Sequence, residues 1–281
     1  MNTAMHGNQC LFDTVDMQWL KYRKQLHNCR HNSDEKSIHK LRISIRRLLS
    51  LIELLQALTA DQALRKLKKS LKAQLNAFNE LRDTQVMLQT VSAAVFSMPE
   101  LTPFLHQLHL NTQKLLMDTP ATIQTLDSEK LQKNLKPALQ KLKKTYSDSD
   151  VKPDVLHAMD SCYQTALARY QSLDPNQPAT LHHLRVSLKK FRYMLSCVAD
   201  ILPELPTDHL KHLQTYLTHL GEIQNTCVLL NNLTSFFNSS IPPTVLSHYR
   251  QHQSELVQTY LAQSADIELF WRSTTSQAFP W

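Results

Sequence analysis

Apolar residues recur along most of the chain at the three- and four-residue spacing of amphipathic helices. Short polar segments that contain proline or aspartate separate these periodic stretches. Because long helices joined by short turns pack antiparallel, the pattern predicts a four-helix bundle in each half of the chain. The helices are expected at 12–31, 35–58, 60–96 and 100–118, at a connecting segment 129–146, and at 153–172, 178–202, 207–238 and 242–264.

Composition supports a purely helical protein. The 281 residues include only two glycines, so few positions suit tight hairpin turns, and leucine, glutamine, lysine and alanine favour helix. We therefore predict the all-α fold class. Residues 265–281 follow no clear period, and we expect either a loose tail or one whose last two aromatic residues pack against the bundle.

Two segments that lie far apart have nearly the same sequence. Residues 38–49 read IHKLRISIRRLL, and residues 181–192 read LHHLRVSLKKFR. A second pair follows at almost the same offset, with NELRDTQVML at 79–88 and GEIQNTCVLL at 221–230. Such self-similarity predicts a tandem duplication. The expected boundaries are a first repeat at 10–120, a connecting segment at 121–152, a second repeat at 153–264 and a tail at 265–281.

Each copy of the first segment forms an amphipathic helix with a cationic side. The aliphatic residues share one stripe, and the cationic residues and histidines fall on the opposite side. No carboxylate interrupts either cationic column. The columns consist of His39, Arg42 and Arg46 in the first copy, and of His182, Arg185, Lys189 and Arg192 in the second.

A further helix face in the first half is cationic without an intervening acid, and it carries Arg65, Lys68, Lys69 and Lys72. The formal net charge is +7 and the isoelectric point is about 9.1. A solubility face normally mixes signs, because like charges one helical turn apart repel. Arginine also matches phosphate oxygens with its planar fork of donors. The pattern therefore favours an anion-binding surface over a simple solvated one.

Both repeated segments resemble the CHAD domain family, an all-helical family named for its histidine-bearing helices. LHHLRVSLKKFRYML at 181–195 is especially similar to the family motif, and LRD at 81–83 and LGEIQN at 220–225 resemble its later motifs. The resemblance spans residues 10 to 264. It implies two four-helix bundles related by a pseudo-twofold axis, with a basic central groove or channel between them.

The resemblance also implies a function and a ligand set. Members of the family bind inorganic polyphosphate, often at polyphosphate granules, so we expect a stand-alone binding protein of that kind. The implied contacts are His39, Arg42, Arg46, Arg47, His182, Arg185, Lys189 and Lys190. Because histidine titrates near neutral pH, polyanion affinity should fall between about pH 6 and 8 through His39 and His182.

The sequence departs from a symmetric pattern at Asp83, where the second half has Asn225. We expect a structural role for Asp83, in which it orients a nearby arginine or lysine. A nucleic acid or another polyanion, such as a phosphoprotein, is the alternative ligand. No stacking aromatics alternate with the cations, which makes nucleic acid the weaker interpretation.

A metal-dependent phosphohydrolase is a further alternative, prompted by the fourteen histidines. His209, His212 and His219 share a helix stripe but lack nearby acidic or cysteine partners, and no HExxH or glycine-rich loop occurs. We therefore predict no catalytic residue, no metal and no cofactor. The scattered cysteines without a CxxC pair indicate a reduced cytoplasmic protein, and no apolar run suits a membrane span.

Overall fold

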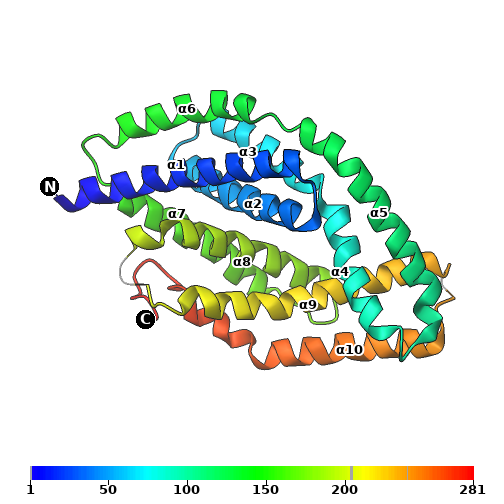
Figure 1. The fold of residues 1–281 in the computed structure, drawn as a ribbon. Helices are drawn as coiled ribbons and strands as arrows, with labels where there is room; N and C mark the ends of the chain where they lie inside the picture. The colour runs from blue at the N-terminus through cyan, green and yellow to red at the C-terminus, as the bar shows by residue number, and fades with distance from the viewer. Residues whose placement is uncertain (1, 203–204, 239) are drawn as a thin grey trace.

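The computed structural model describes residues 2–202, 205–238 and 240–281, and this part of the chain contains helices and no strand. The all-α prediction is confirmed. In the first half the helices are α1 (Asn2–His31), α2 (Glu35–Leu58), α3 (Gln62–Asn76), α4 (Asn79–Ala94), η1 (Pro99–Leu101) and α5 (Thr102–Gln124). The remaining helices are α6 (Ser128–Thr145), α7 (Lys152–Gln171), α8 (Pro178–Val198), η2 (Ala199–Ile201), α9 (His209–Phe236), α10 (Pro243–Ala262) and η3 (Ser264–Leu269) (Figure 1).

The single helix expected at 60–96 is wrong, because the chain forms α3 and α4 with a break at Ala77 and Phe78. Phe78 leaves helical geometry (φ −110°, ψ 9°) and buries its ring in the core with 1% of its surface exposed. The corresponding part of the second half stays continuous as α9. Neither glycine nor proline occurs at this break.

Helix pairings in the first half recur in the second. Helix α1 packs on α2, α2 on α3, and α4 on α5, while α7 packs on α8, α8 on α9, and α9 on α10. Helix α9 thus takes the places of both α3 and α4. A duplication predicts these pairings, and the twofold axis itself stays a prediction. The halves also meet directly, because α2 contacts both α7 and α8.

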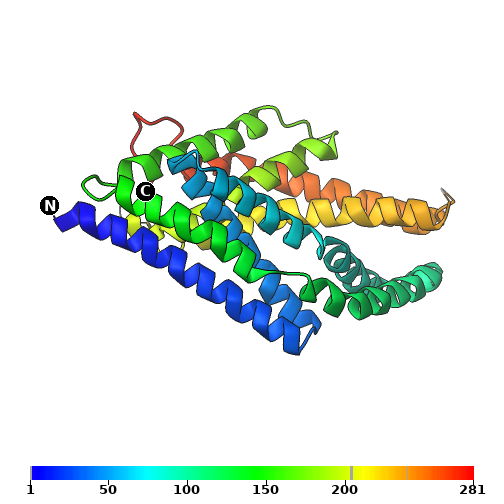
Figure 2. The same ribbon diagram turned by 90° about the horizontal axis from the view of Figure 1, so that it is seen from above.

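Two clusters of buried apolar residues stabilise the chain. The larger one includes residues from both halves, among them Leu41 and Leu48 of α2 and Leu184 and Phe191 of α8. The smaller one joins α4 and α5 to α9 and α10. It lies at one end of an elongated molecule, and both termini lie at the other end (Figures 1 and 2). None of the helices described here is long and apolar enough to cross a lipid bilayer.

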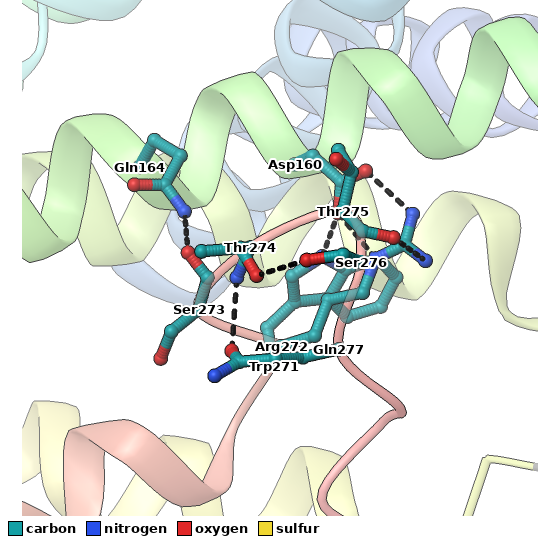
Figure 3. Close-up of polar contacts among 9 residues, drawn as sticks. All are labelled: Asp160, Gln164, Trp271, Arg272, Ser273, Thr274, Thr275, Ser276 and Gln277. Atoms are coloured by element: carbon teal, nitrogen blue, oxygen red, sulfur yellow. Dashed lines mark hydrogen bonds and ion pairs between the residues drawn. The ribbon is translucent and has the colours of Figure 1, made fainter.

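The C-terminal tail packs against α7, so it is a docked segment and not a loose one. Trp271 is fully buried, and its Nε1 donates a hydrogen bond to Oδ1 of the buried Asp160 at 2.7 Å. Arg272 donates to both carboxylate oxygens of Asp160, with Nε to Oδ1 at 2.8 Å and Nη2 to Oδ2 at 2.6 Å (Figure 3). Its guanidinium also lies over the ring of Phe279. Phe279 and Trp281 stack on each other at a centroid distance of 4.9 Å.

We expect Arg272→Ala to lower the free energy of unfolding by about 3 kcal/mol, because it leaves the buried Asp160 carboxylate without its charged partner. Denaturant unfolding of both proteins measures this change. The control is Arg169→Ala, which removes an exposed arginine near the end of the same α7 helix and should change stability by less than about 1 kcal/mol. Equal effects of the two substitutions would contradict a docked tail.

Candidate anion-binding site

The contact between α2 and α8 brings cationic side chains from both halves of the chain together. Arg42 and Arg46 come from α2, and their counterparts in the repeated motif, Arg185 and Lys189, come from α8. The charge of Arg46 acts on all three of the others and lowers their pKa values. With Arg192, one helical turn further along α8, these residues form what we call the cation cluster.

An open pocket of about 360 Å³ lies over the cation cluster. Helix α2 contributes one residue to its wall, and α8 and α9 contribute the others. The lining residues are Arg46, Arg185, Lys189, Arg192, Tyr193, Gln214, Leu217, Thr218, Gly221, Glu222 and Asn225. The pocket is therefore shared between the halves and concentrates positive charge at its α2–α8 side.

Arg42 is buried rather than solvent-facing, which corrects the expectation that the whole column lies opposite the core. Only 4% of its surface is exposed. Its Nη1 donates to the backbone oxygen of Leu75 at 3.2 Å, and its Nη2 donates to Oδ1 of Asn79 at 3.1 Å. Burial, and then the charge of Arg46, lower the pKa of Arg42 to about 10. Arg42 thus holds the break between α3 and α4 in addition to adding charge.

Arg185, the counterpart of Arg42, lies along the backbone of α9. A Cβ atom placed on Gly221 would be 3.6 Å from both its Nε and its Nη2. Burial and the charge of Arg46 lower the pKa of Arg185. The Nε atoms of Arg185 and Arg192 are both buried without a hydrogen-bond partner. Such donors are costly to leave unpaired, so the cluster has hydrogen-bonding capacity that an anion could use.

Lys189 is the lysine of the cluster, and its pKa is strongly lowered. Burial lowers its pKa the most, followed by the charges of Arg46, Arg185 and Arg192, and together they bring the pKa to about 7. Lysine normally titrates near 10.4. The charged form of Lys189 is therefore less favoured than that of an ordinary lysine.

Two carboxylates lie near the cluster, and neither forms an ion pair with it. The charge of Asp83 on α4 acts on Arg42 and Arg185 and raises their pKa values, and its orienting role stays a prediction. Glu222 of α9 lines the pocket, and it lies in the LGEIQN segment although it was not predicted as a site residue. The ion pairs in the described part of the chain lie elsewhere, at Lys68–Glu53, Lys141–Asp61, Lys190–Glu53 and Arg272–Asp160.

Several residues of the expected ligand set lie outside the cluster. Glu53 pairs with Lys68 at 2.8 Å and with Lys190 at 3.7 Å, beside a second pocket formed largely with α7. Because successive helix residues point about 100° apart, Lys189 and Lys190 cannot both face the cluster. On α2 the exposed Arg47 is likewise turned about 100° away from its neighbour Arg46, and it lies near Cys197. Three other residues of the expected ligand set, Arg65, Lys69 and Lys72, are exposed on α3.

The two motif histidines flank the cluster in different surroundings. Much of the His39 side chain is exposed. The part of it that is shielded from water, and then the charges of Arg82 and Arg42, lower its pKa. His182 bonds through Nδ1 to Oε1 of Gln224 at 2.8 Å. Gln224 takes the place of Arg82 in the aligned repeats, so the first half carries one more cation here. Arg82 was not predicted as a site residue, although it lies within the LRD segment at 81–83.

The histidine stripe of α9 has a structural explanation at one of its members. His209 is buried, and its Nε2 lies 3.0 Å from the backbone oxygen of Phe270 in the docked tail. Across the residues described, no group of three histidine, cysteine, aspartate or glutamate side chains is arranged to hold a metal ion.

Comparisons with known proteins agree with the sequence motifs. The family model named CHAD domain matches residues 16–234. Among solved structures, the chain is similar to the crystal structure of the CHAD domain from the plant Ricinus communis, with 16% identity and a TM-score of 0.68. That match covers 98% of this chain and 93% of the plant chain, and at this identity it shows the fold alone. No curated protein matches the sequence.

Removing Arg42 and removing Lys189 should have opposite effects on stability. Arg42→Ala loses both hydrogen bonds at the α3–α4 break, and we expect it to lower the free energy of unfolding by about 2 kcal/mol. Lys189→Met removes a partly buried cation among like charges and should raise this free energy by about 1 kcal/mol. Lys190→Met, which breaks the pair with Glu53, is the control and should not stabilise. Destabilisation by Lys189→Met in denaturant unfolding would contradict the repulsion described here.

Proposed function

The chain belongs to the CHAD domain family, and on that premise we propose that it binds inorganic polyphosphate with the cation cluster as the centre of its binding site. The observation that carries the proposal is the meeting of Arg46 and Lys189. These residues occupy equivalent positions in the two repeats, they line one pocket, and neither has an ion-pair partner among the described residues. Negative charge from outside the chain fits this arrangement.

The chemistry of the cluster suits a linear polyphosphate. Such a chain carries about one negative charge per phosphate and presents rows of oxygen acceptors, so charge density matters more than a fitted shape. Arginine offers paired donors to phosphate oxygens, and lysine offers a compact charge. Arg185 and Arg192 both line the pocket, and their buried Nε atoms have no other hydrogen-bond partner. Binding would release counterions and weaken with salt, as for other polyanions.

The proposal gives the protein a binding role rather than an enzymatic one, because the cluster supplies positive charge and hydrogen-bond donors to a ligand. No cofactor is needed for that role. A polymer longer than the pocket would continue toward further cations, and Arg82 beside His39 lies on the first-half side. Association with polyphosphate granules in the cytoplasm follows from the same chemistry.

Nucleic acid is the competing polyanion, and the pocket gives a reason to rank it lower. Tyr193 is the aromatic residue in the pocket wall, and the guanidinium of Arg192 already lies 4.7 Å from the centre of its ring. Single-stranded binders usually combine cations with several aromatic faces on which bases stack. We therefore expect polyphosphate to be preferred over RNA of equal charge.

The direct test compares polymer with monomer. Long-chain polyphosphate should raise the thermal unfolding temperature, since a ligand that binds the folded state alone stabilises it. Orthophosphate at equal phosphorus content should raise it far less, because a single phosphate reaches only part of the cluster. A thermal shift assay measures both ligands, with RNA of matched charge as a third. Equal shifts from orthophosphate and polymer would contradict a polymer site, and a larger shift from RNA would favour nucleic acid.

The shared site predicts that each half contributes at least one contact to the ligand. Arg46→Gln and Lys189→Gln should each weaken polyphosphate binding about tenfold at pH 6, as the loss of one charge-assisted contact of about 1–2 kcal/mol implies. The matched controls are Arg47→Gln and Lys190→Gln, the neighbouring residues that point elsewhere, and their affinity should change less than threefold. Fluorescence titration measures the four variants. A larger loss in the controls would place the site on another surface.

A further inference from the structure

Lys189 stands apart from the other cluster members because it can exchange its proton near neutral pH. Arg46 of α2 and Arg185 and Arg192 of α8 line the same pocket as Lys189. The charges of these three arginines and of Arg42 all act on its ammonium group. Arginine keeps its proton under all ordinary conditions. When these charges are confined together, Lys189 is therefore the one member of the cluster that can relieve the repulsion by losing a proton.

The groups on neighbouring helices do not offset this repulsion. From α9, Glu222 lines the same pocket but forms no ion pair with Lys189. From α4, Asp83 acts on Arg42 and Arg185. Helix α7 packs on another side of α8, where Lys190 pairs with Glu53. Helix α1 also contacts α8, and its Lys21 acts near Cys197.

We propose that Lys189, which shares a pocket with three arginines and has no ion-pair partner among the described residues, takes up a proton when a polyanion binds above neutral pH, so that binding is coupled to pH through this residue. The proposal rests on the proposed function and specifies how the same site is regulated. The step moves one proton from solvent to the Nζ atom of Lys189, and no other bond forms or breaks. The negative charge of the ligand then stabilises the ammonium group.

The direction of the effect follows from linkage. In the free protein, burial and the neighbouring arginines hold the pKa of Lys189 near 7. A bound polyanion favours the charged form and raises that pKa. Below pH 7 the proton is present in both states, so affinity is constant. Above pH 7 the free protein must gain the proton on binding, so affinity falls with rising pH by up to tenfold per unit.

This origin of pH dependence differs from the one that the sequence suggested. His39 is exposed and lies near Arg82, while His182 bonds to Gln224. Both histidines flank the cluster, and Lys189 lies within it. A histidine effect would act chiefly around pH 6.5, whereas the Lys189 effect continues to pH 8 and above. Variants of the two residue types separate these sources.

The decisive variant is Lys189→Arg, which keeps a positive charge in place but cannot lose its proton. Binding of long-chain polyphosphate is measured by titration at pH 6 and pH 8 at fixed ionic strength. Wild-type affinity should fall about tenfold from pH 6 to pH 8, as one proton of uptake implies. Lys189→Arg should change less than threefold and bind more tightly than wild type at pH 8. The control is His39→Gln combined with His182→Gln, which should keep most of the wild-type fall.

Calorimetry at pH 8 in two buffers of different ionisation enthalpy counts the protons directly. Wild type should take up about one proton more than Lys189→Arg on binding polyphosphate. If wild type binds at pH 6 but Lys189→Arg keeps the full pH dependence and the same proton count, this inference is overturned and the binding function stands. If wild type does not bind polyphosphate at pH 6, the proposed function fails, and the coupling that rests on it fails too.

Discussion

The packing of α2 against α8 is the constraint on which the candidate site depends. Each helix is anchored by its own apolar stripe, with Leu41 and Leu48 on one and Leu184 and Phe191 on the other, all within one buried cluster. That anchoring brings Arg46 and Lys189 together although their charges repel. Burial and then this repulsion lower the pKa of Lys189. Beside it, the Nε atoms of Arg185 and Arg192 are buried without hydrogen-bond partners. A fold that confines like charges in this way is ready for an anion, because the ligand removes a repulsion already present.

The equivalent arginines Arg42 and Arg185 have different contacts in the two repeats. Arg42 bonds to the end of α3 and to Asn79, so it stabilises a helix break that exists only in the first half. Arg185 meets an unbroken α9 at Gly221 and keeps a buried Nε atom free of hydrogen bonds. In the first half Arg42 therefore stabilises the fold through hydrogen bonds, while in the second half Arg185 lines the pocket. This asymmetry places most of the ligand-binding capacity on α8.

The sequence predicted the helical class, most helix boundaries and the cationic columns, because each of these follows from local periodicity. It did not predict the α3–α4 break, because Phe78 fits the apolar pattern and the hydrogen bonds from Arg42 to Leu75 and Asn79 join segments that are far apart in sequence. The predicted ligand set also combined residues that lie in two different surroundings in the structure. Lys190 was grouped with Lys189 through the family resemblance, although Glu53, far away in sequence, pairs with Lys190. Likewise Glu222 enters the pocket from α9. The pairing of Lys190 and the position of Glu222 depend on contacts between segments far apart in sequence, which a local sequence pattern cannot predict.

The central claim is that one polyphosphate chain is held by equivalent residues of both halves at the α2–α8 contact. A crystal structure of the protein with bound long-chain polyphosphate tests this claim most directly. The account predicts a continuous row of phosphates in the pocket, with oxygens within hydrogen-bonding distance of both Arg46 and Lys189 and of at least one of Arg185 and Arg192. Phosphates bound along the exposed lysines of α3, or in contact with the cations of one half alone, would contradict it.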